Sequence, residues 1–232
     1  MSKSVIVIGA GVVGLACGEE LSERGYEVFI AEQEQYIATQ TSARNSGVIH
    51  AGIYYPTDSL KAKLCVRGKN LLYEYCEKFN ISHSNTKKMI VSTTNEETQI
   101  LLKLKDTAAK NGVQLDLING HDAVEREPNL FAVSALVSPT TGIVDTSELA
   151  ASFQHQAELN GASLALETNI TKITQNSKIL VSGISGGEEF EAEFDFLINA
   201  AGHGAHKLTQ SYWHEAPPLP KNFAKGNYFS IA

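Results

Sequence analysis

The sequence has little cysteine, no long apolar run and no excess of basic residues, and each shortage excludes a class of protein. Three cysteines in 232 residues cannot form a disulfide framework, so a reducing, cytoplasmic setting is predicted. No uninterrupted apolar run approaches the roughly 18 residues needed to span a bilayer, which predicts no transmembrane segment and leaves peripheral contact with an inner membrane open. Nineteen basic against 26 acidic residues give a net charge of −7, which excludes a broad basic surface for nucleic acid.

The first 32 residues have the pattern of a dinucleotide-binding βαβ unit. Residues 5–8 are apolar and mostly β-branched, as in a buried parallel strand. A G-x-G-x-x-G motif follows, then a helical pattern, and a second apolar run ends at Glu32. The glycines and the acidic pair Glu19-Glu20 argue against a signal peptide. Strand, glycines, helix, strand and acid at this spacing predict an α/β fold with a dinucleotide site.

Each part of this unit has a predicted role in the site. Gly9 allows the tight turn, Gly11 lets a pyrophosphate approach the backbone, and Gly14 lets the helix pack on the strand. The helix N-terminus offers N–H groups and a positive dipole end to phosphates. Glu32 is placed to accept hydrogen bonds from both ribose hydroxyls and would repel a 2′-phosphate. The predicted cofactor contacts here are Gly9, Ala10, Gly11, Val12, Val13, Gly14, Glu32 and Gln33.

Residues 41–55 form the second informative stretch. Small hydroxyl residues, one arginine, one amide and two glycines lie close together, and the loop can donate hydrogen bonds to phosphates and a planar ring. An ordinary surface loop is the alternative, although such loops seldom place a Val-Ile-His segment between two glycines. The predicted contacts here are Thr41, Ser42, Arg44, Asn45, Ser46, Gly47, Val48 and Ile49.

Hydrophobic periodicity and turn residues predict the remaining elements. We expect an N-cap within residues 56–58 for a helix that runs to Phe79, a capping box at residues 94–97, and Thr146 or Ser147 as the cap of a helix ending near Asn160. The other expected helices lie at residues 94–110 and 120–128, and strands are expected at 88–93, 113–118, 132–138, 162–167, 178–182, 190–192, 194–199 and from 225 to 232. The strand expected at 194–199 should return to the first sheet, which contains residues 5–8.

With these motifs identified, the chain resembles the D-amino-acid-oxidase superfamily of FAD-dependent oxidoreductases. Within it, the chain looks most like the L-2-hydroxyglutarate dehydrogenase/oxidase family. The resemblance covers the whole chain and is carried by residues 45–55, 59–66, 72–76, 142–145, 199–202 and 225–229. It implies a Rossmann-like FAD-binding domain with an interleaved, incomplete α+β substrate domain.

The resemblance also implies how the cofactor and substrate are used. FAD would oxidise a small L-2-hydroxy acid, most plausibly L-2-hydroxyglutarate, by hydride transfer, and oxygen or a quinone would be the electron acceptor. Backbone of Ile170 would meet the adenine, and Ala200, Ala201 and Gly202 would pass beneath the phosphates. His50 is the candidate catalytic residue: as a general base, as a non-covalent flavin contact, or as a covalent tether.

Other functions stay open at this point. An amine- or amino-acid-oxidising flavoenzyme is not excluded. Glycerol-3-phosphate enzymes carry His-Gly-Gly-x-Arg-Tyr in this loop, whereas Ala51 replaces a glycine here and Tyr54 stands at the arginine position. An inactive, truncated flavoprotein remnant is the third alternative. No Cys, His or Asp cluster has the spacing of metal ligands, and His121 with its neighbouring acids is interpreted as a solvated face.

The predicted domains interleave along the chain. Residues 1–80 and 143–212 are assigned to the FAD-binding domain, and residues 81–142 and 213–232 to the substrate domain. Because family members extend well past this length, the chain is expected to be C-terminally truncated and to turn over little by itself.

Overall fold

The computed structural model describes residues 2–213, 215–218, 222, 224, 226 and 227. The chain divides into two compact units, Met1–Ala43 with Phe153–Ala232, and Arg44–Ser152. The strand predicted from residue 225 to residue 232 lies outside the described residues, except for Gly226 and Asn227. Of the helices within the described part of the chain, none is long and apolar enough to cross a membrane.

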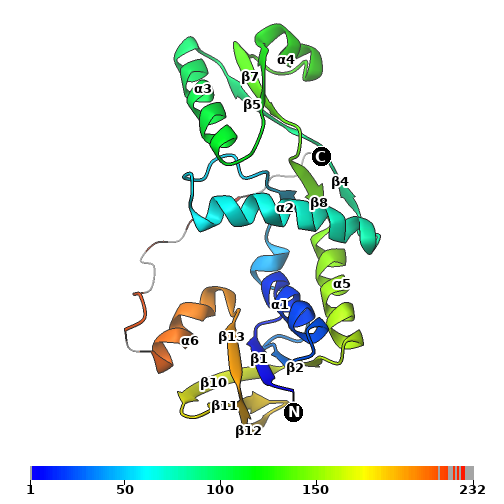
Figure 1. The fold of residues 1–232 in the computed structure, drawn as a ribbon, viewed down its shortest axis with the longest axis vertical. Helices are drawn as coiled ribbons and strands as arrows, with labels where there is room; N and C mark the ends of the chain where they lie inside the picture. Colours follow the sequence, from blue (N-terminus) through cyan, green and yellow to red (C-terminus); the bar gives the residue numbers. More distant parts are fainter. Residues whose placement is uncertain (1, 214, 219–221, 223, 225, 228–232) are drawn as a thin grey trace. The chain divides into compact units, whose positions relative to one another are not determined.

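The first unit is built on a parallel sheet with the strand order β13-β1-β2-β9 (Figure 1). Val5 and Val7 of β1 are fully buried because the strand has neighbours on both sides. The predicted return of the late strand to the first sheet is confirmed by the pairing of Val7 with Ile198. The sheet and its helices comprise β1 (Ser4–Ile8), α1 (Val12–Glu23), β2 (Glu27–Ala31), β9 (Ser163–Ala165), β13 (Phe196–Asn199) and α6 (Ala205–Tyr212).

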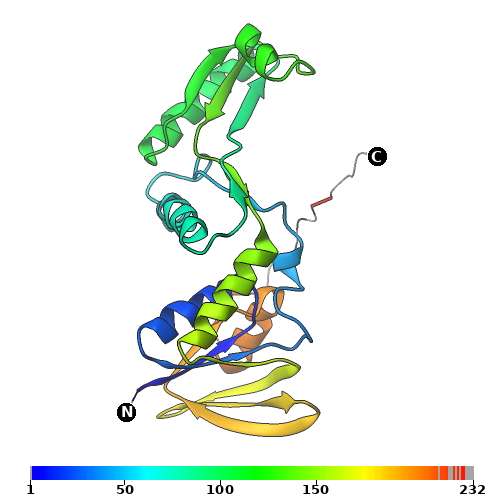
Figure 2. The ribbon, with the colours of Figure 1, turned by 90° about the vertical axis from the view of Figure 1, so that its right-hand side faces the viewer.

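A second, antiparallel sheet belongs to the same unit (Figure 2). It consists of β10 (Thr168–Gln175), β11 (Ile179–Ser185) and β12 (Glu188–Phe194). Gly186 and Gly187, both at positive φ, make the hairpin turn between β11 and β12. Strand β10 was not predicted, because its sequence is polar and only half of it faces the core. Ile173, Val181 and Phe194 pack against Ile6 and Ile8, so the two sheets share one core.

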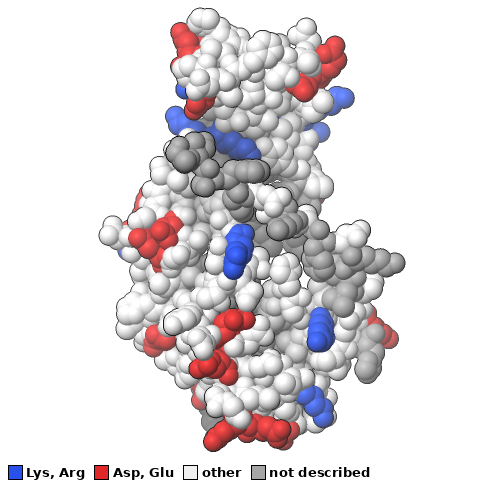
Figure 3. Space-filling view, turned by 180° about the vertical axis from the view of Figure 1, so that it is seen from behind, with Lys and Arg blue, Asp and Glu red and all other residues white. Residues whose placement is uncertain are grey.

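Strand β12 lies at a free edge of the antiparallel sheet and is strongly acidic. Its sequence, EEFEAEF, alternates exposed glutamates with inward aromatic and alanine side chains. Figure 3 shows acidic side chains gathered at the end of the molecule where this sheet lies. Glutamates along an unpaired edge disfavour pairing with another chain, so the charge protects this edge from aggregation.

The second unit contains two further three-stranded sheets. One has the order β3-β8-β4 and the other β5-β7-β6. Val91 of β5 and Leu136 of β7 therefore lie in a sheet separate from that of Val5 and Ile198. The elements of this unit are β3 (Val48–Ile49), α2 (Leu60–Lys78), β4 (His83–Ser84), β5 (Lys88–Ser92), α3 (Asn95–Lys110), β6 (Asp116–Asn119), α4 (Gly120–Arg126), β7 (Ser134–Ser138), β8 (Gly142–Val144) and the first half of α5 (Thr146–Leu159). The short 3-10 helix η1 (Thr41–Ala43) ends the first segment of the first unit.

The core of the second unit holds the chain segment that follows His50. Ala51 and Ile53 are buried against Leu101 and Ala108 of α3 and Leu136 of β7. The segment is therefore fixed on a helix and a sheet rather than lying free on the surface. It follows that the side chains on its other side are held in place for a site.

Two predicted helix caps are wrong by one residue. Ser59, not a residue of 56–58, caps α2, and its hydroxyl accepts from the backbone N–H of Ala62 at 3.1 Å. Asp145, not Thr146 or Ser147, caps α5, and its Oδ1 accepts from the N–H groups of Ser147 and Glu148, each at 2.9 Å. Asp145 places a carboxylate beside the positive end of the helix, which stabilises the helix start.

The compact units divide the chain at positions other than the predicted domains. The units change at residues 43/44 and 152/153, whereas the prediction placed boundaries at 80/81 and 142/143. Helix α2 lies in the second unit, together with the segment that follows His50. The compact units are separated by packing, whereas the predicted domains are separated by the cofactor or substrate that each would hold. The assignment of residues to a FAD-binding and a substrate domain therefore stays a prediction.

Candidate active site

The turn between β1 and α1 leaves room only for glycine at two positions. Gly9 has φ +102°, and a Cβ there would lie 2.6 Å from the carbonyl oxygen of Ala200. A Cβ on Gly14 would collide with the carbonyl oxygen of Gly9. The glycines are thus required by backbone packing, as the sequence predicted for the turn and for the helix.

The N-terminus of α1 is approached by the side chain of Ser42. Gly11 is the N-cap and has no side chain to cap the helix. The Ser42 hydroxyl instead accepts from the Val12 N–H at 3.0 Å, and a Cβ on Gly11 would lie 3.1 Å from the same oxygen. Val13, in the first turn, is 65% exposed. The structure therefore brings together Ser42 and the helix end, two predicted cofactor contacts that are 30 residues apart.

Glu32 is buried and binds the backbone of its own unit. Its Oε2 accepts from the Ala10 N–H at 2.7 Å, and its Oε1 accepts from the Glu34 N–H at 3.0 Å. Each carboxylate oxygen can accept a second hydrogen bond, so these contacts leave acceptor capacity for ribose hydroxyls. Glu32 has a structural role that the sequence did not reveal, and its contact with ribose stays a prediction.

Two predicted phosphate-side segments meet at the turn. Ala200, which follows β13, donates its N–H to Ile8 at 2.9 Å and lies against Gly9. The next residues start a short 3-10 helix (η2, Gly202–Gly204), and Gly202 has φ +53°. Thr41 lies near Gly202, with its Oγ1 4.0 Å from an added Cβ.

Ile170, the predicted adenine contact, lies half-buried in β10, against the shared core of the first unit.

Residues 44–49 belong to the second unit and are ordered by local contacts. The Asn45 side chain accepts from the Gly47 N–H at 2.7 Å. Gly47 has φ +62°, its carbonyl oxygen accepts from the Val144 N–H, and a Cβ on it would lie 2.5 Å from the Val144 oxygen. Val48 and Ile49 then pair with β8 as strand β3. This explains why the loop carries a glycine there and delivers His50 at the end of a strand.

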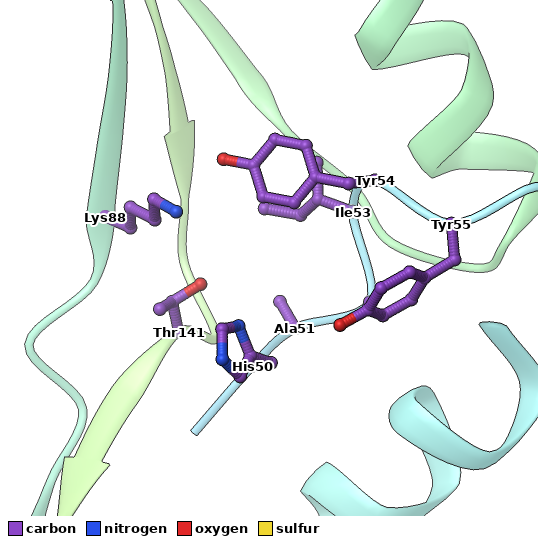
Figure 4. Close-up of a pocket in the computed structure, with 8 residues that line it drawn as sticks. His50, Ala51, Ile53, Tyr54, Tyr55, Lys88 and Thr141 are labelled. Carbon is purple, nitrogen blue, oxygen red and sulfur yellow. The ribbon is translucent and has the colours of Figure 1, made fainter. Parts of the chain in front are cut away.

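His50 opens onto a small pocket in the second unit (Figure 4). The pocket has a volume of about 10 Å³, which is room for roughly one water-sized group. In Figure 4 the ammonium group of Lys88, the hydroxyl group of Thr141 and the imidazole of His50 all point into the same space. Its lining residues are His50, Ala51, Gly52, Ile53, Tyr54, Tyr55, Lys88 and Thr141.

Lys88 and Thr141 were missed as site residues. Lys88 begins β5, and Thr141 precedes β8, so three distant segments meet at this pocket. The only signal in the sequence was a lysine at the start of an otherwise apolar strand. Thr141 is buried, and its hydroxyl lies 2.8 Å from the Ser138 hydroxyl.

The pocket is electropositive although the chain as a whole is acidic. Partial burial is the main cause that lowers the pKa of His50 below its usual value, and the positive charges of Lys88 and Lys61 add to the shift. Lys88 lies 4.9 Å from the centre of the Tyr54 ring, and Lys61 lies 4.7 Å from that of Tyr55. Imidazole is therefore favoured in its neutral form, which can accept a proton.

Helix α2 contributes a second layer beside this pocket. The Cys65 thiol lies 3.4 Å from the carbonyl oxygen of His50, and burial raises its pKa. Burial also raises the pKa of Tyr55, with a further contribution from Cys65. Lys69, whose pKa is lowered by burial, donates to the Thr140 hydroxyl at 3.2 Å. These contacts tie α2 to the segments on both sides of the pocket.

Three described histidines outside the pocket, His121, His203 and His206, lie on exposed surfaces. His121, Asp122 and Glu125 lie close enough together to share an ion, but on the exposed face of the seven-residue helix α4, where the sequence predicted a solvated surface. Asp122 is already engaged at the helix start by the side chain of Asn119. His203 and His206 are exposed around the start of α6.

Comparison with known proteins identifies the family. The profile of the family described as "FAD dependent oxidoreductase" (DAO) matches residues 4–232. The chain belongs to this family. Over 98% of its length it is 37% identical to the mitochondrial L-2-hydroxyglutarate dehydrogenase of Arabidopsis thaliana. Over its whole length it is 32% identical to the L-2-hydroxyglutarate dehydrogenase of Indibacter alkaliphilus.

Solved structures agree with this assignment. The FAD-bound L-alpha-glycerophosphate oxidase of Mycoplasma pneumoniae matches with a TM-score of 0.80 and 26% identity, over 91% of this chain and 57% of that one. The chain covers 53% of the Arabidopsis protein and 58% of the Indibacter protein, a little over half of each relative.

The first unit fits the family cofactor on its own geometry. The backbone at Gly9, Gly11 and Gly14 is packed so closely against Ala200, Ser42 and Gly9 that a Cβ would collide or crowd at each glycine, and this tight turn leads into the N-terminus of α1. Glu32 lies buried at the end of the neighbouring strand with its carboxylate against this turn. These are the features required for the pyrophosphate and ribose of FAD.

Proposed function

We propose that this chain is part of an enzyme that oxidises an L-2-hydroxy acid, with L-2-hydroxyglutarate as its substrate. The observation that carries the proposal is the pocket at His50, where a proton acceptor and a lysine meet in one small space. The names of the relatives with 32–37% identity supply the substrate.

The residues of the first unit would hold the cofactor. The backbone of residues 9–14 and Ser42 would face the pyrophosphate, and Glu32 would bind the adenosine ribose. FAD, when bound, supplies the two-electron acceptor for converting a C–H beside a hydroxyl into a carbonyl. The chain contributes binding, orientation and proton handling.

His50 would accept the proton of the substrate hydroxyl. Its lowered pKa favours the neutral imidazole near pH 7, the form able to act as a base. The buried side chains of Ala51 and Ile53 hold the backbone next to His50 in place, so the imidazole is presented without reorganisation. The positive charges of Lys88 and Lys61 favour a substrate that carries an anionic group.

Oxidation assays with an artificial dye as electron acceptor test the proposal. The FAD-loaded 232-residue chain, and any longer reading frame that contains it, are assayed with L-2-hydroxyglutarate, its D-enantiomer, glycerol 3-phosphate and sarcosine. We expect little turnover by the 232-residue chain and turnover of the L-acid alone by the longer chain, with a loss of about 100-fold or more in kcat for His50→Gln in the longer chain. His155→Gln, an exposed histidine on α5, is the matched control.

Two results would reject the proposal. Turnover of sarcosine or glycerol 3-phosphate without the L-acid would assign the enzyme to another substrate class. Denaturation that releases NAD rather than FAD would reject the cofactor itself.

A further inference from the structure

We infer that Lys88 is the residue that binds the carboxylate next to the reacting carbon of the substrate, with Thr141 as a second hydrogen-bond donor. The identity of the acid rests on the proposed function, whereas the anion site rests on the pocket itself. The juxtaposition that carries the inference is an ammonium group and an imidazole lining the same small pocket (Figure 4).

Among the residues that the structure describes, no carboxylate pairs with the ammonium group of Lys88. None of the lining residues is acidic, and the ion pairs in this part of the chain involve other lysines, Lys63 and Lys178. Lys88 is half-buried, and its ammonium group lies over the face of the Tyr54 ring. A cation held in a pocket without a counter-ion, in a chain of net charge −7, favours an anionic ligand.

The pocket is too small for a whole substrate and large enough for one end group. A volume of about 10 Å³ holds roughly one water-sized group. One carboxylate oxygen would fill it, and the second oxygen of the same carboxylate would lie at the opening of the pocket. The Ser138 hydroxyl can donate its hydrogen bond to the Thr141 hydroxyl. The hydrogen of the Thr141 hydroxyl is then available to donate to the bound group.

The position of His50 decides which carboxylate enters. His50 and Lys88 line the same pocket, so the group on Lys88 must lie within a bond or two of the hydroxyl that His50 deprotonates. In a 2-hydroxy acid that group is the carboxylate on the carbinol carbon. The second carboxylate of a dicarboxylic acid lies farther along the chain and would contact other residues.

Calorimetric titration of the 232-residue chain tests the inference without turnover. The probes are 2-oxoglutarate and pyruvate, which both carry the carboxylate in question and differ in the second one. We expect Lys88→Met to weaken the binding of both probes by about tenfold or more, because a charge-assisted hydrogen bond is lost. Lys88→Arg, which keeps the charge, should retain more of the binding of both probes than Lys88→Met.

Matched variants separate direct contact from general charge. Lys61→Met removes an equal charge near His50 from a residue that does not line the pocket, and should weaken binding by less than about threefold. Lys63→Met, an exposed lysine on the same helix, sets the baseline. Thermal unfolding of each variant reports whether loss of the contact with Tyr54 disturbs the fold.

Each possible result of these titrations either supports the anion site at Lys88 or overturns it. Equal losses for both probes in Lys88→Met, with Lys61→Met near the baseline, support the site. Equal binding by Lys88→Met and Lys63→Met overturns it while leaving the proposed oxidation standing. Loss for 2-oxoglutarate alone overturns the assignment to the carboxylate beside the reacting carbon, and absence of binding to the wild type overturns the site. Binding that depends on Lys88 without oxidation of any 2-hydroxy acid supports the site and rejects the proposed function.

Discussion

The turn at residues 9–14 and the pocket at His50 both contain glycines, but different atoms shape them. In the turn, backbone oxygens of Ala200 and Gly9 occupy the space where a side chain would be. At the pocket, Gly52 lies against the side chain of Val66, and the lining side chains come from three segments. In the proposed function, the turn would recognise a shape that any dinucleotide shares, whereas the pocket would recognise the charge and proton of one class of substrate.

The largest expected effect comes from breaking the tight backbone turn at residues 9–14. Gly14→Ala places a methyl group on the Gly9 carbonyl, so we expect a loss of about 1–3 kcal/mol in the free energy of unfolding and a failure to retain FAD. Gly68→Ala is the control, since it also lies in a helix but in open space, and should be neutral or stabilising by up to about 1 kcal/mol. Denaturant unfolding and flavin absorbance measure both. Equal behaviour of the two variants would refute the steric account.

The next largest effect is expected from Glu32, whose single side chain supports the backbone of the turn. Glu32→Ala removes the acceptor of two backbone N–H groups, so we expect a loss of about 1–3 kcal/mol and weaker FAD retention. Glu34→Ala, whose recorded side-chain partners are exposed glutamines, serves as the control and should change stability by less than about 0.5 kcal/mol. Urea titration and measurement of bound flavin report the two effects. If Glu32→Ala kept full stability, the structural role of the carboxylate would be rejected.

Asn111 connects the pocket segment to α3, and its loss should act on the pocket alone. Its Nδ2 donates to the carbonyl oxygens of Tyr55 at 2.9 Å and Gly52 at 3.4 Å. We expect Asn111→Ala to cost about 1 kcal/mol and to leave FAD binding unchanged. Asn160 also follows a helix and precedes a glycine, but it is exposed, so Asn160→Ala should cost less. Flavin loss in Asn111→Ala would contradict the independence of the two regions.

The smallest effect is electrostatic and confined to His50. Its pKa in the folded chain lies below the value near 6.5 of an unfolded chain, so the folded state binds fewer protons between the two values. The His50 contribution therefore makes the chain less stable as the pH falls through that window, and the penalty vanishes above the unfolded value. NMR titration should show that Lys88→Met moves the pKa of His50 upward, while Lys63→Met does not. An unchanged pKa would show that Lys88 does not act on the imidazole.

The difference between the two regions also explains what the sequence could predict. The turn, its glycines and Glu32 are consecutive or nearly so, and local backbone rules link them to a dinucleotide. Pairing of β13 with the first sheet was predicted from the order of the elements, in which an apolar strand follows the later helix and the strands after it. Lys88 and Thr141 reach His50 only through the packing of β5, β8 and the segment after His50, which no local pattern encodes. Strand β10 escaped prediction for the same reason, because tertiary pairing overrode its polar sequence.

Strand β1 is synthesised long before β13, one of its two neighbours in the sheet. Its neighbour β13 is made last among the strands of the sheet, and the contact between Ser4 and Asp195 joins residues 191 positions apart. At a translation rate of roughly 5–20 residues per second, β1 waits for about 10–40 s before its partner leaves the ribosome. During that interval β1 lacks one of its two neighbouring strands, so the nascent chain exposes an apolar strand edge that can pair with a wrong partner until the sheet closes.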